Sequence, residues 1–275
     1  MTQQASGTPD YTMGFSDEFM ESVRRYTAEA SAGYLLPHLR PGMRVLDFGC
    51  GPGTISVGLA KAIEPGELHG VDMEESQIEL ARRVAETSGN HNAFFHVGDV
   101  TALDFEDNCF DLAHCHNVLL YVPDTRAVLQ EAKRVLKPGG IIACREMIVG
   151  SCFTHPDYGV IRKSWDMFED LLAADDAHPQ MGKDMKGHII EAGFTNLRMT
   201  ASFDIYSTQK DVDFIHALAI QWFLSPEIVE AAIKYGASSQ ELCDEIRIAY
   251  DRWRQDPGAS VGVAFGEAVA SKPYG

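Results

Sequence analysis

With 275 residues, 45% of them hydrophobic, the chain is long enough to bury a sizeable core, either as one domain with an elaboration or as two small ones. Its 40 acidic residues against 23 basic ones give a formal net charge of −17, which repels phosphate backbones and anionic lipid surfaces. This balance disfavours nucleic acid as a partner.

The sequence shows neither a membrane span nor an export signal. No apolar run approaches the roughly 18 to 20 residues of a membrane span, and residues 1–10 lack the basic and then apolar build of a signal peptide. We therefore expect a cytoplasmic protein.

The six cysteines have no C-x-x-C pair among them, which fits reduced thiols better than a disulfide framework or a zinc site. His114, Cys115 and His116 are consecutive, but successive residues of a strand point to opposite faces, so Cys115 leaves the face that the histidines share. We expect no metal site.

The chain begins with a loose segment over residues 1–10 and then turns helical. Ser16 has the side chain of an N-cap, which predicts a helix to about Ala32. A second short helix over residues 32–39 is expected to end at the Pro41-Gly42 breaker.

A short apolar run then breaks into glycines and resumes as an amphipathic segment, which predicts a strand over residues 44–48, a tight turn and a helix over 55–63. Glycine suits this turn because the chain visits positive φ and because backbone there approaches whatever sits at the helix N-terminus. A nucleotide-like ligand is one interpretation, and an ordinary strand-to-helix turn is the other. The third slot of the dinucleotide pattern G-x-G-x-x-G holds Thr54, which weakens an NAD interpretation.

Asp72 ends the next apolar run, about 20 to 25 residues past the glycines, within reach of a ribose diol. An isolated carboxylate after a strand is more often a helix N-cap or a solvated turn residue. The paired spacing of glycines and carboxylate favours the ligand.

Strand and helix patterns alternate from here to residue 149. The predicted elements are a strand at 68–72, a helix at 76–88, strands at 93–97 and 110–116, a helix at 125–136 and a strand at 140–149. Such alternation predicts a parallel sheet covered on both faces, with ligands beyond the carboxyl ends of its strands.

The remaining chain departs from a minimal fold. We expect helices at 156–174 and 181–192, a strand at 197–206, inserted helices at 211–222, 226–235 and 239–254, and a last strand at 260–270.

Four motifs stand in series in the first half of the chain: residues 47–53 (DFGCGPG), Val71-Asp72, residues 98–100 (GDV) and residues 134–140 (RVLKPGG). With them the chain resembles the class I S-adenosylmethionine-dependent methyltransferases, and within them the ubiquinone/menaquinone-type and related small-molecule methyltransferases. The resemblance is close over residues 40 to 150.

The resemblance implies an α/β, Rossmann-like, doubly wound fold with a mostly parallel seven-stranded sheet whose last strand is antiparallel. It divides the chain into an N-terminal helical lid segment (1–40), an S-adenosylmethionine-binding core (41–150) and the rest of the sheet (151–275). The last part carries a helical substrate cap at about 207–256, inserted before the last strand.

The resemblance also assigns the cofactor contacts. Asp72 would accept both ribose hydroxyls, with Gln77 nearby, Met73 would pack on adenine, and Asp99 and Val100 would bond its edge. The turn, Asp47 and the end of the fourth strand would hold the methionine and sugar portions. The cofactor-binding candidates are Asp47, Gly49, Cys50, Gly51, Gly53, Asp72, Met73, Gln77, Asp99, Val100, His116 and Asn117. Asp47 equally fits a carboxylate that caps the glycine turn, and His116 a satisfied residue at a strand end.

Methyl transfer to carbon or to a hydroxyl leaves a proton to be removed, and histidine is a natural base. His155, in an expected loop after the fifth strand, is the first candidate; a loop histidine at a helix start is the alternative. An aromatic substrate wall is expected from Tyr11, Phe15, Tyr158, Trp165, His216, Trp222 and Phe223, some of which will be core.

These features predict a methyltransferase that uses S-adenosyl-L-methionine to methylate carbon or oxygen of an apolar small molecule, aromatic, quinol-like or isoprenoid-bearing. The alternatives are an NAD-dependent oxidoreductase and a cofactor-binding sensor without catalysis. The expected partner is the acceptor, without nucleic acid or membrane span; the N-terminal helix could also pack on a second subunit.

Overall fold

The computed structural model describes residues 25–274, whose eight strands form one sheet in the order β3-β2-β1-β4-β5-β8-β6, with β7 paired to β8 as well. Strands β1 to β5 run parallel, and β8 runs antiparallel to β5, β6 and β7. The strands are β1 (Arg44–Phe48), β2 (Glu67–Asp72), β3 (Ala93–Val97), β4 (Phe110–His116), β5 (Leu136–Met147), β6 (Phe153–His155), β7 (Thr195–Tyr206) and β8 (Ser260–Ser271).

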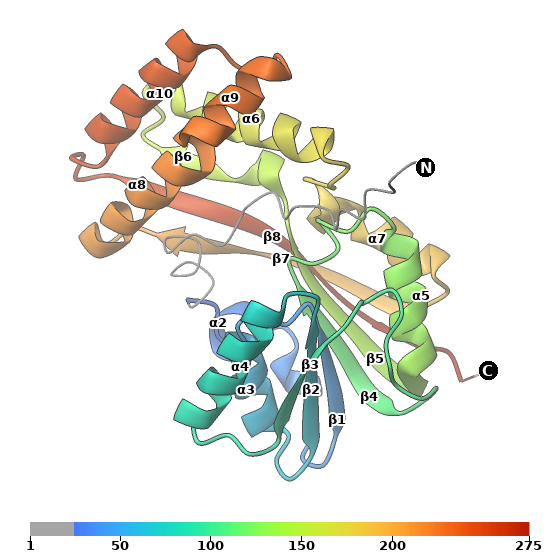
Figure 1. The fold of residues 1–275 in the computed structure, drawn as a ribbon. Helices are drawn as coiled ribbons and strands as arrows, with labels where there is room; N and C mark the ends of the chain where they lie inside the picture. The colour runs from blue at the N-terminus through green and yellow to red at the C-terminus, as the bar shows by residue number, and fades with distance from the viewer. Residues whose placement is uncertain (1–24, 275) are drawn as a thin grey trace, which may run out of the picture.

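Helices cover both faces of the sheet (Figure 1). One face carries α2 (Ala28–Ser31), the 3-10 turn η1 (Leu36–His38), α3 (Thr54–Ala62) and α4 (Glu75–Thr87), and the other carries α5 (Thr125–Val135) and α7 (Met181–Glu191). The longer helices α3, α4, α5 and α7 bury a mostly apolar stripe, such as Val128, Leu129 and Ala132 of α5. The predicted doubly wound α/β fold is confirmed.

A second helical layer lies beside the N-terminal half of β8 and consists of α6 (Ile161–Ala174), α8 (Gln209–Leu224), α9 (Pro226–Lys234) and α10 (Gln240–Trp253) (Figure 1). We call it the cap. Its core is aromatic: the ring centroids of Trp165 and Phe223 are 5.2 Å apart, and those of Phe223 and Tyr250 are 6.2 Å apart.

Among residues 25–274, no single helix is long and apolar enough to cross a membrane. The pair α8 and α9, bent by 41° at their junction, passes the same test of length and composition only when both are taken together.

Two predictions for the N-terminal segment are wrong where they fall within the described residues. The helix expected to reach Ala32 does not pass through Thr27, because this residue is extended (φ −126°, ψ 164°) and its hydroxyl accepts the N–H of Ala30 as the N-cap of α2. Between residues 32 and 39 only η1 forms, with Pro37 in its turn. Residues 1–24, which make up the larger part of the predicted lid segment (1–40), lie outside the described residues, so the lid and the oligomer contact stay predictions.

The segment after β5 also differs from the prediction. Residues 153–155 form β6 instead of a loop, because β8 extends beyond the end of β5 and offers them a partner, which makes eight strands instead of seven. Helix α6 begins at Ile161 and not at Pro156, since Tyr158 and Gly159 hold left-handed φ values of 50° and 83° that no α-helix accommodates.

One buried ionic row crosses the sheet on the face of α2. Arg145 of β5 stands opposite His116 of β4 and Glu267 of β8. Its guanidinium is 1% exposed, lies 2.7 Å from Oδ1 of Asp204 and 3.6 Å from Oε1 of Glu267, and stacks 3.6 Å from the centre of the Phe265 ring. The row ties β5 and β7 together across β8.

Replacing Arg145 with methionine is expected to lower the free energy of unfolding by about 3 to 5 kcal/mol, because the buried carboxylate of Glu267 and the partly buried carboxylate of Asp204 lose their counter-charge. Arg254→Met, which breaks the exposed pair with Asp213, serves as the control and is expected to change stability little. Urea unfolding of both variants measures this. Equal losses in the two variants would show that the row is not a buried charge system.

Candidate active site

The glycine turn after β1 has the backbone that its sequence predicts. Gly49, Gly51 and Gly53 hold φ values of 69°, 51° and 73°. A Cβ on Gly49 would meet the Val118 side chain at 2.3 Å and one on Gly53 the Ala81 side chain at 2.9 Å, whereas a Cβ on Gly51 would meet nothing within 4 Å. Gly49 and Gly53 are thus required by packing, and Gly51 faces open space where a ligand has access to backbone.

Asp72 is fixed at the end of β2 by two backbone groups. The N–H of Gly51 donates to its Oδ2 (2.9 Å), and the N–H of Glu74 donates to its Oδ1 (3.0 Å). Burial raises the pKa of Asp72, while these two bonds oppose the rise. Each carboxylate oxygen keeps a lone pair for another donor, which is the chemistry that a vicinal diol needs.

Asp47 points into the protein. It is 2% exposed, its Oδ2 accepts from the hydroxyl of Ser56 on α3, and its Oδ1 accepts from Nδ1 of His114 at 2.8 Å. This geometry joins β1, α3 and β4 behind the turn through two side chains, those of Ser56 and His114. A contact of Asp47 with the cofactor's amino end stays a prediction.

Several predicted adenine-side residues gather beside Asp72. Met73 is an apolar side chain with 55% of its surface exposed, and the N–H of Gly98 donates to the carbonyl of Asp72, which brings Asp99 and Val100 to the same edge. One carboxylate oxygen of Asp99 accepts from Thr101. Gln77 is buried on the first turn of α4.

His116 and Asn117 end β4 on the other side of the turn. The His116 ring lies edge-on to Tyr26 with centroids 4.6 Å apart, and within residues 25–274 neither ring nitrogen has a hydrogen-bond partner. Burial, with Arg145 and His114 adding to it, lowers the pKa of His116 well below its usual value, so the ring is neutral. Asn117 has φ 53° and its Oδ1 accepts the N–H of Met147, so its side chain fastens β4 to β5.

Sequence reasoning missed Glu146, which supports this edge from β5. Its carboxylate is fully buried and accepts the N–H groups of Val118 (3.1 Å), Leu119 (3.0 Å) and Leu120 (3.1 Å). Val118 in turn packs against Gly49, so Glu146 holds the loop that borders the turn. The adjacent charges of Arg145 and Glu146, inside an otherwise apolar strand, were the available signal.

The predicted base His155 is not brought together with these residues. It lies in β6, its side chain is exposed, and its carbonyl accepts from Nε1 of Trp253. His155 pairs with Ser260 of β8, whereas the end of β5 pairs with Phe265 of β8. Ser260 and Phe265 are five residues apart, so about 17 Å of strand separates His155 from the end of β5. Its role as a base stays a prediction.

The residues predicted to form an aromatic wall do not all lie together. Trp165, Trp222 and Phe223 come together between the cap and β8, but around a cavity of about 30 Å³, the volume of one water. Tyr158 donates its hydroxyl to Asp256, and His216 pairs with Asp251 at 2.8 Å on the cap. Tyr11 and Phe15 lie outside the described residues.

All six cysteines are free thiols, as predicted. Cys115 leaves the histidine face and lies 3.5 Å from Oε1 of Glu146. Within residues 25–274, no three His, Cys, Asp or Glu side chains form a cluster that could hold a metal ion.

Glu146 gives the fold a pH dependence. Burial raises its pKa from the ordinary 4.5 to about 7, against the three N–H bonds. The folded protein therefore keeps a proton that an unfolded chain releases, so this contribution to stability is complete below about pH 4.5 and is lost as the pH rises through about 7.

We accordingly expect the free energy of unfolding of the wild type, relative to Glu146→Gln, to fall between about pH 5 and pH 8. Urea unfolding of both proteins across this range measures the difference. A difference that stays constant, or that grows with pH, would contradict the raised pKa.

Comparisons with known proteins agree with this geometry. Residues 39–206 match the model of a methyltransferase domain. The chain is 30% identical to the uncharacterized methyltransferase C1B3.06c of Schizosaccharomyces pombe over 277 residues, covering 95% of this chain and 96% of that one. It is 35% identical over 176 residues to the demethylmenaquinone methyltransferase of Staphylococcus saprophyticus, covering 59% of this chain and 74% of the relative.

Among solved structures, the YcgJ protein of Bacillus subtilis has the same fold, with a TM-score of 0.62 and 18% identity over 90% of this chain and 100% of that one. The domain match and the full-length relative, together with the strand-end site, identify the family. The chain belongs to the S-adenosylmethionine-dependent methyltransferases.

Proposed function

We propose that the protein transfers a methyl group to a carbon or oxygen atom of an apolar small molecule, aromatic, quinol-like or isoprenoid-bearing. The observation that carries this proposal is the methyltransferase domain match, together with a relative named for demethylmenaquinone. We propose further that part of the acceptor lies in a groove of about 1070 Å³ in the cap, along one side of the bent pair α8 and α9 and facing α10. A small-molecule site typically has a volume of about 300 to 1,000 Å³.

The groove has an apolar floor and a few polar groups. Its apolar residues recur every three or four positions along α8 and α9 and include Ala217, Ile220, Leu224, Val229 and Ile233. The polar residues that line it are Gln221, Ser225, Glu230, Lys234, Gln240 and Arg247, and the Oε1 atom of Gln221 is buried with no partner within residues 25–274. This composition fits an acceptor with an apolar body and polar substituents.

The name of one relative points to the same class of acceptor. The Staphylococcus saprophyticus protein is named for demethylmenaquinone. We carry over from it the class of an apolar acceptor and not the compound.

On the cofactor side, we propose that Asp72 accepts the two ribose hydroxyls and that Met73 covers one face of adenine. Asp99 would accept from the adenine amino group and the N–H of Val100 would donate to the ring. Gly51, the residue of the turn that faces open space, would give the cofactor access to backbone.

S-adenosylmethionine supplies, when bound, an electrophilic methyl carbon on a sulfonium. The residues of this chain bind it, orient it and exclude water, and orientation alone can contribute a large part of such a rate enhancement. Acceptor methylation leaves a proton to be removed, for which His155 is the base proposed from the sequence.

Two alternative functions suggested by the sequence can be tested by different measurements. The family match opposes an NAD-dependent oxidoreductase, and a parallel titration with NADH tests it directly. A sensor without catalysis would bind the cofactor but transfer no methyl group to any acceptor, so turnover tests it.

Replacing Asp72 with alanine is expected to weaken binding of S-adenosylhomocysteine by about 1 to 3 kcal/mol, because the charge-assisted bonds to the ribose are lost. Calorimetric titration measures the affinity. Glu75→Ala removes an exposed neighbouring carboxylate and is the matched control, expected to leave affinity unchanged. Unchanged affinity in a folded Asp72 variant would remove this residue from the site.

Radiolabelled methyl transfer to quinols, polyprenols and polar catechols is expected to give labelled product from the apolar acceptors. Val229→Glu places a charge in the groove and should raise the acceptor KM at least about tenfold, with the affinity for S-adenosylhomocysteine unchanged. Ile248→Glu, on α10 but outside the groove and 68% exposed, is the control. Normal acceptor kinetics in Val229→Glu, or turnover of polar acceptors alone, would refute the proposed acceptor site.

A further inference from the structure

The loop between β3 and β4, residues 98–109, carries the proposed adenine contacts and has no regular secondary structure. Asp99 lies in a tight turn, in which its carboxylate accepts the N–H of Thr101 (2.7 Å) and its carbonyl accepts the N–H of Ala102 (3.1 Å). Leu103 follows this turn directly. Asp99 and Val100 therefore lie between two anchors: the bond from the N–H of Gly98 to the carbonyl of Asp72 on one side, and whatever holds the loop at Leu103 on the other.

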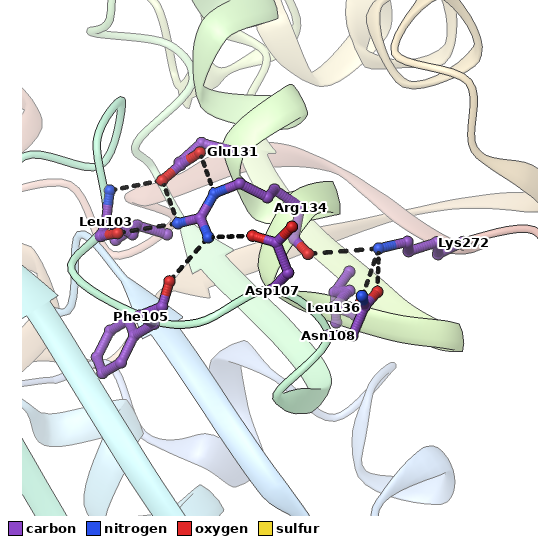
Figure 2. A network of polar contacts seen from close by, with 8 residues as sticks. All are labelled: Leu103, Phe105, Asp107, Asn108, Glu131, Arg134, Leu136 and Lys272. Carbon is purple, nitrogen blue, oxygen red and sulfur yellow. Dashed lines mark hydrogen bonds and ion pairs between the residues drawn. The ribbon is translucent and has the colours of Figure 1, made fainter.

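Arg134 of α5 holds the loop there. Its guanidinium donates to the carbonyls of Leu103 (2.9 Å) and Phe105 (2.8 Å) and to Oδ1 of Asp107 (2.7 Å), as Figure 2 shows. Glu131, one turn earlier on α5, binds the same guanidinium through both carboxylate oxygens (2.7 and 2.9 Å). One planar fork of donors thus fixes three points of the loop.

Glu131 adds a fourth point. Its Oε1 accepts the N–H of Leu103 at 2.7 Å, so both backbone polar groups of Leu103 are bound by the Glu131–Arg134 pair. The bonds from Arg134 keep the pKa of Glu131 below its usual range, so the carboxylate stays charged at neutral pH. The Leu103 side chain is 6% exposed and packs in the main core.

We propose that Arg134 is a positioning residue that sets the adenine-recognition edge of the cofactor site through the loop it holds. The inference rests on the proposed function, in which Asp99 and Val100 read the adenine. Arg134 does not touch the ligand. It fixes Leu103, and no glycine stands between Leu103 and the turn at Asp99.

Lys272 offers a matched comparison at the other end of the same loop. Its ammonium donates to Oδ1 of Asn108 (2.8 Å) and to the carbonyl of Leu136 (2.6 Å) (Figure 2). Asn108 lies next to β4, nine positions after Asp99. Lys272 also reaches the carbonyl of Arg134 (3.4 Å), but the guanidinium of Arg134 makes its bonds to Leu103 and Phe105 without Lys272. Loss of Lys272 is therefore expected to disturb the loop where it enters the sheet.

The test compares the affinities of two ligands, S-adenosylhomocysteine and its deaminated analogue S-inosylhomocysteine, measured by calorimetry on the full-length protein. The wild type is expected to prefer the adenine ligand at least about tenfold, because a carbonyl replaces the amino group opposite the Asp99 carboxylate. In Arg134→Met this preference should fall to less than about threefold, chiefly through weaker binding of the adenine ligand. Lys272→Met should keep the wild-type preference.

An unchanged preference in a folded Arg134→Met protein overturns the inference, because a merely structural arginine lowers the melting temperature without changing which base is read. If Arg134→Met does not fold, Arg134→Lys is measured instead: one ammonium cannot replace the fork, so a reduced preference supports the inference and a wild-type preference overturns it. Wild-type protein that binds neither ligand overturns the proposed function together with the inference, whereas the other results leave the proposed function standing.

Discussion

The hydrogen bond from the N–H of Gly51 to Asp72 is the contact on which the site depends. It joins the turn after β1 to the end of β2, and both of these places are proposed to contact the cofactor. The other oxygen of Asp72 binds the N–H of Glu74 and so fixes the start of α4. The carboxylate is thus immobilised before any ligand arrives, and little ordering entropy remains to oppose binding.

A related arrangement holds two other loops. Glu146 holds the loop after β4 by three N–H groups, and Glu131, near the C-terminal end of α5, holds Leu103 in the loop between β3 and β4. A buried carboxylate that accepts backbone N–H groups gives a loop a defined shape without regular secondary structure. The cost is desolvation, which raises the pKa of Asp72 and Glu146. Part of the acidic composition therefore serves the architecture of the ligand edge.

Local pattern was enough to predict the parallel core, because each of its elements carries its own signal: β1, β3 and β4 have the predicted bounds. The site was predictable where a motif fixes backbone geometry, as at Gly49 and Asp72. What could not be predicted depends on distant partners. Residues 153–155 form a strand only because β8 extends beyond the end of β5 and pairs with them. The burial of the Glu146 carboxylate is explained only by the N–H groups that it accepts, which lie nearly thirty residues away in the sequence. No local spacing encodes such contacts.

Helix α8 separates the packing of the cap from the proposed choice of acceptor. One side, with Ile215, Leu218 and Ala219, lines the small cavity against Val261 and Val263 of β8, while the opposite side lines the groove. Substitutions on the groove side leave the contacts with the sheet untouched, and no residue of the groove belongs to the glycine turn or to the loops around Asp72. The same core can therefore keep its cofactor geometry while the groove changes, because the two sides of α8 contact different parts of the protein.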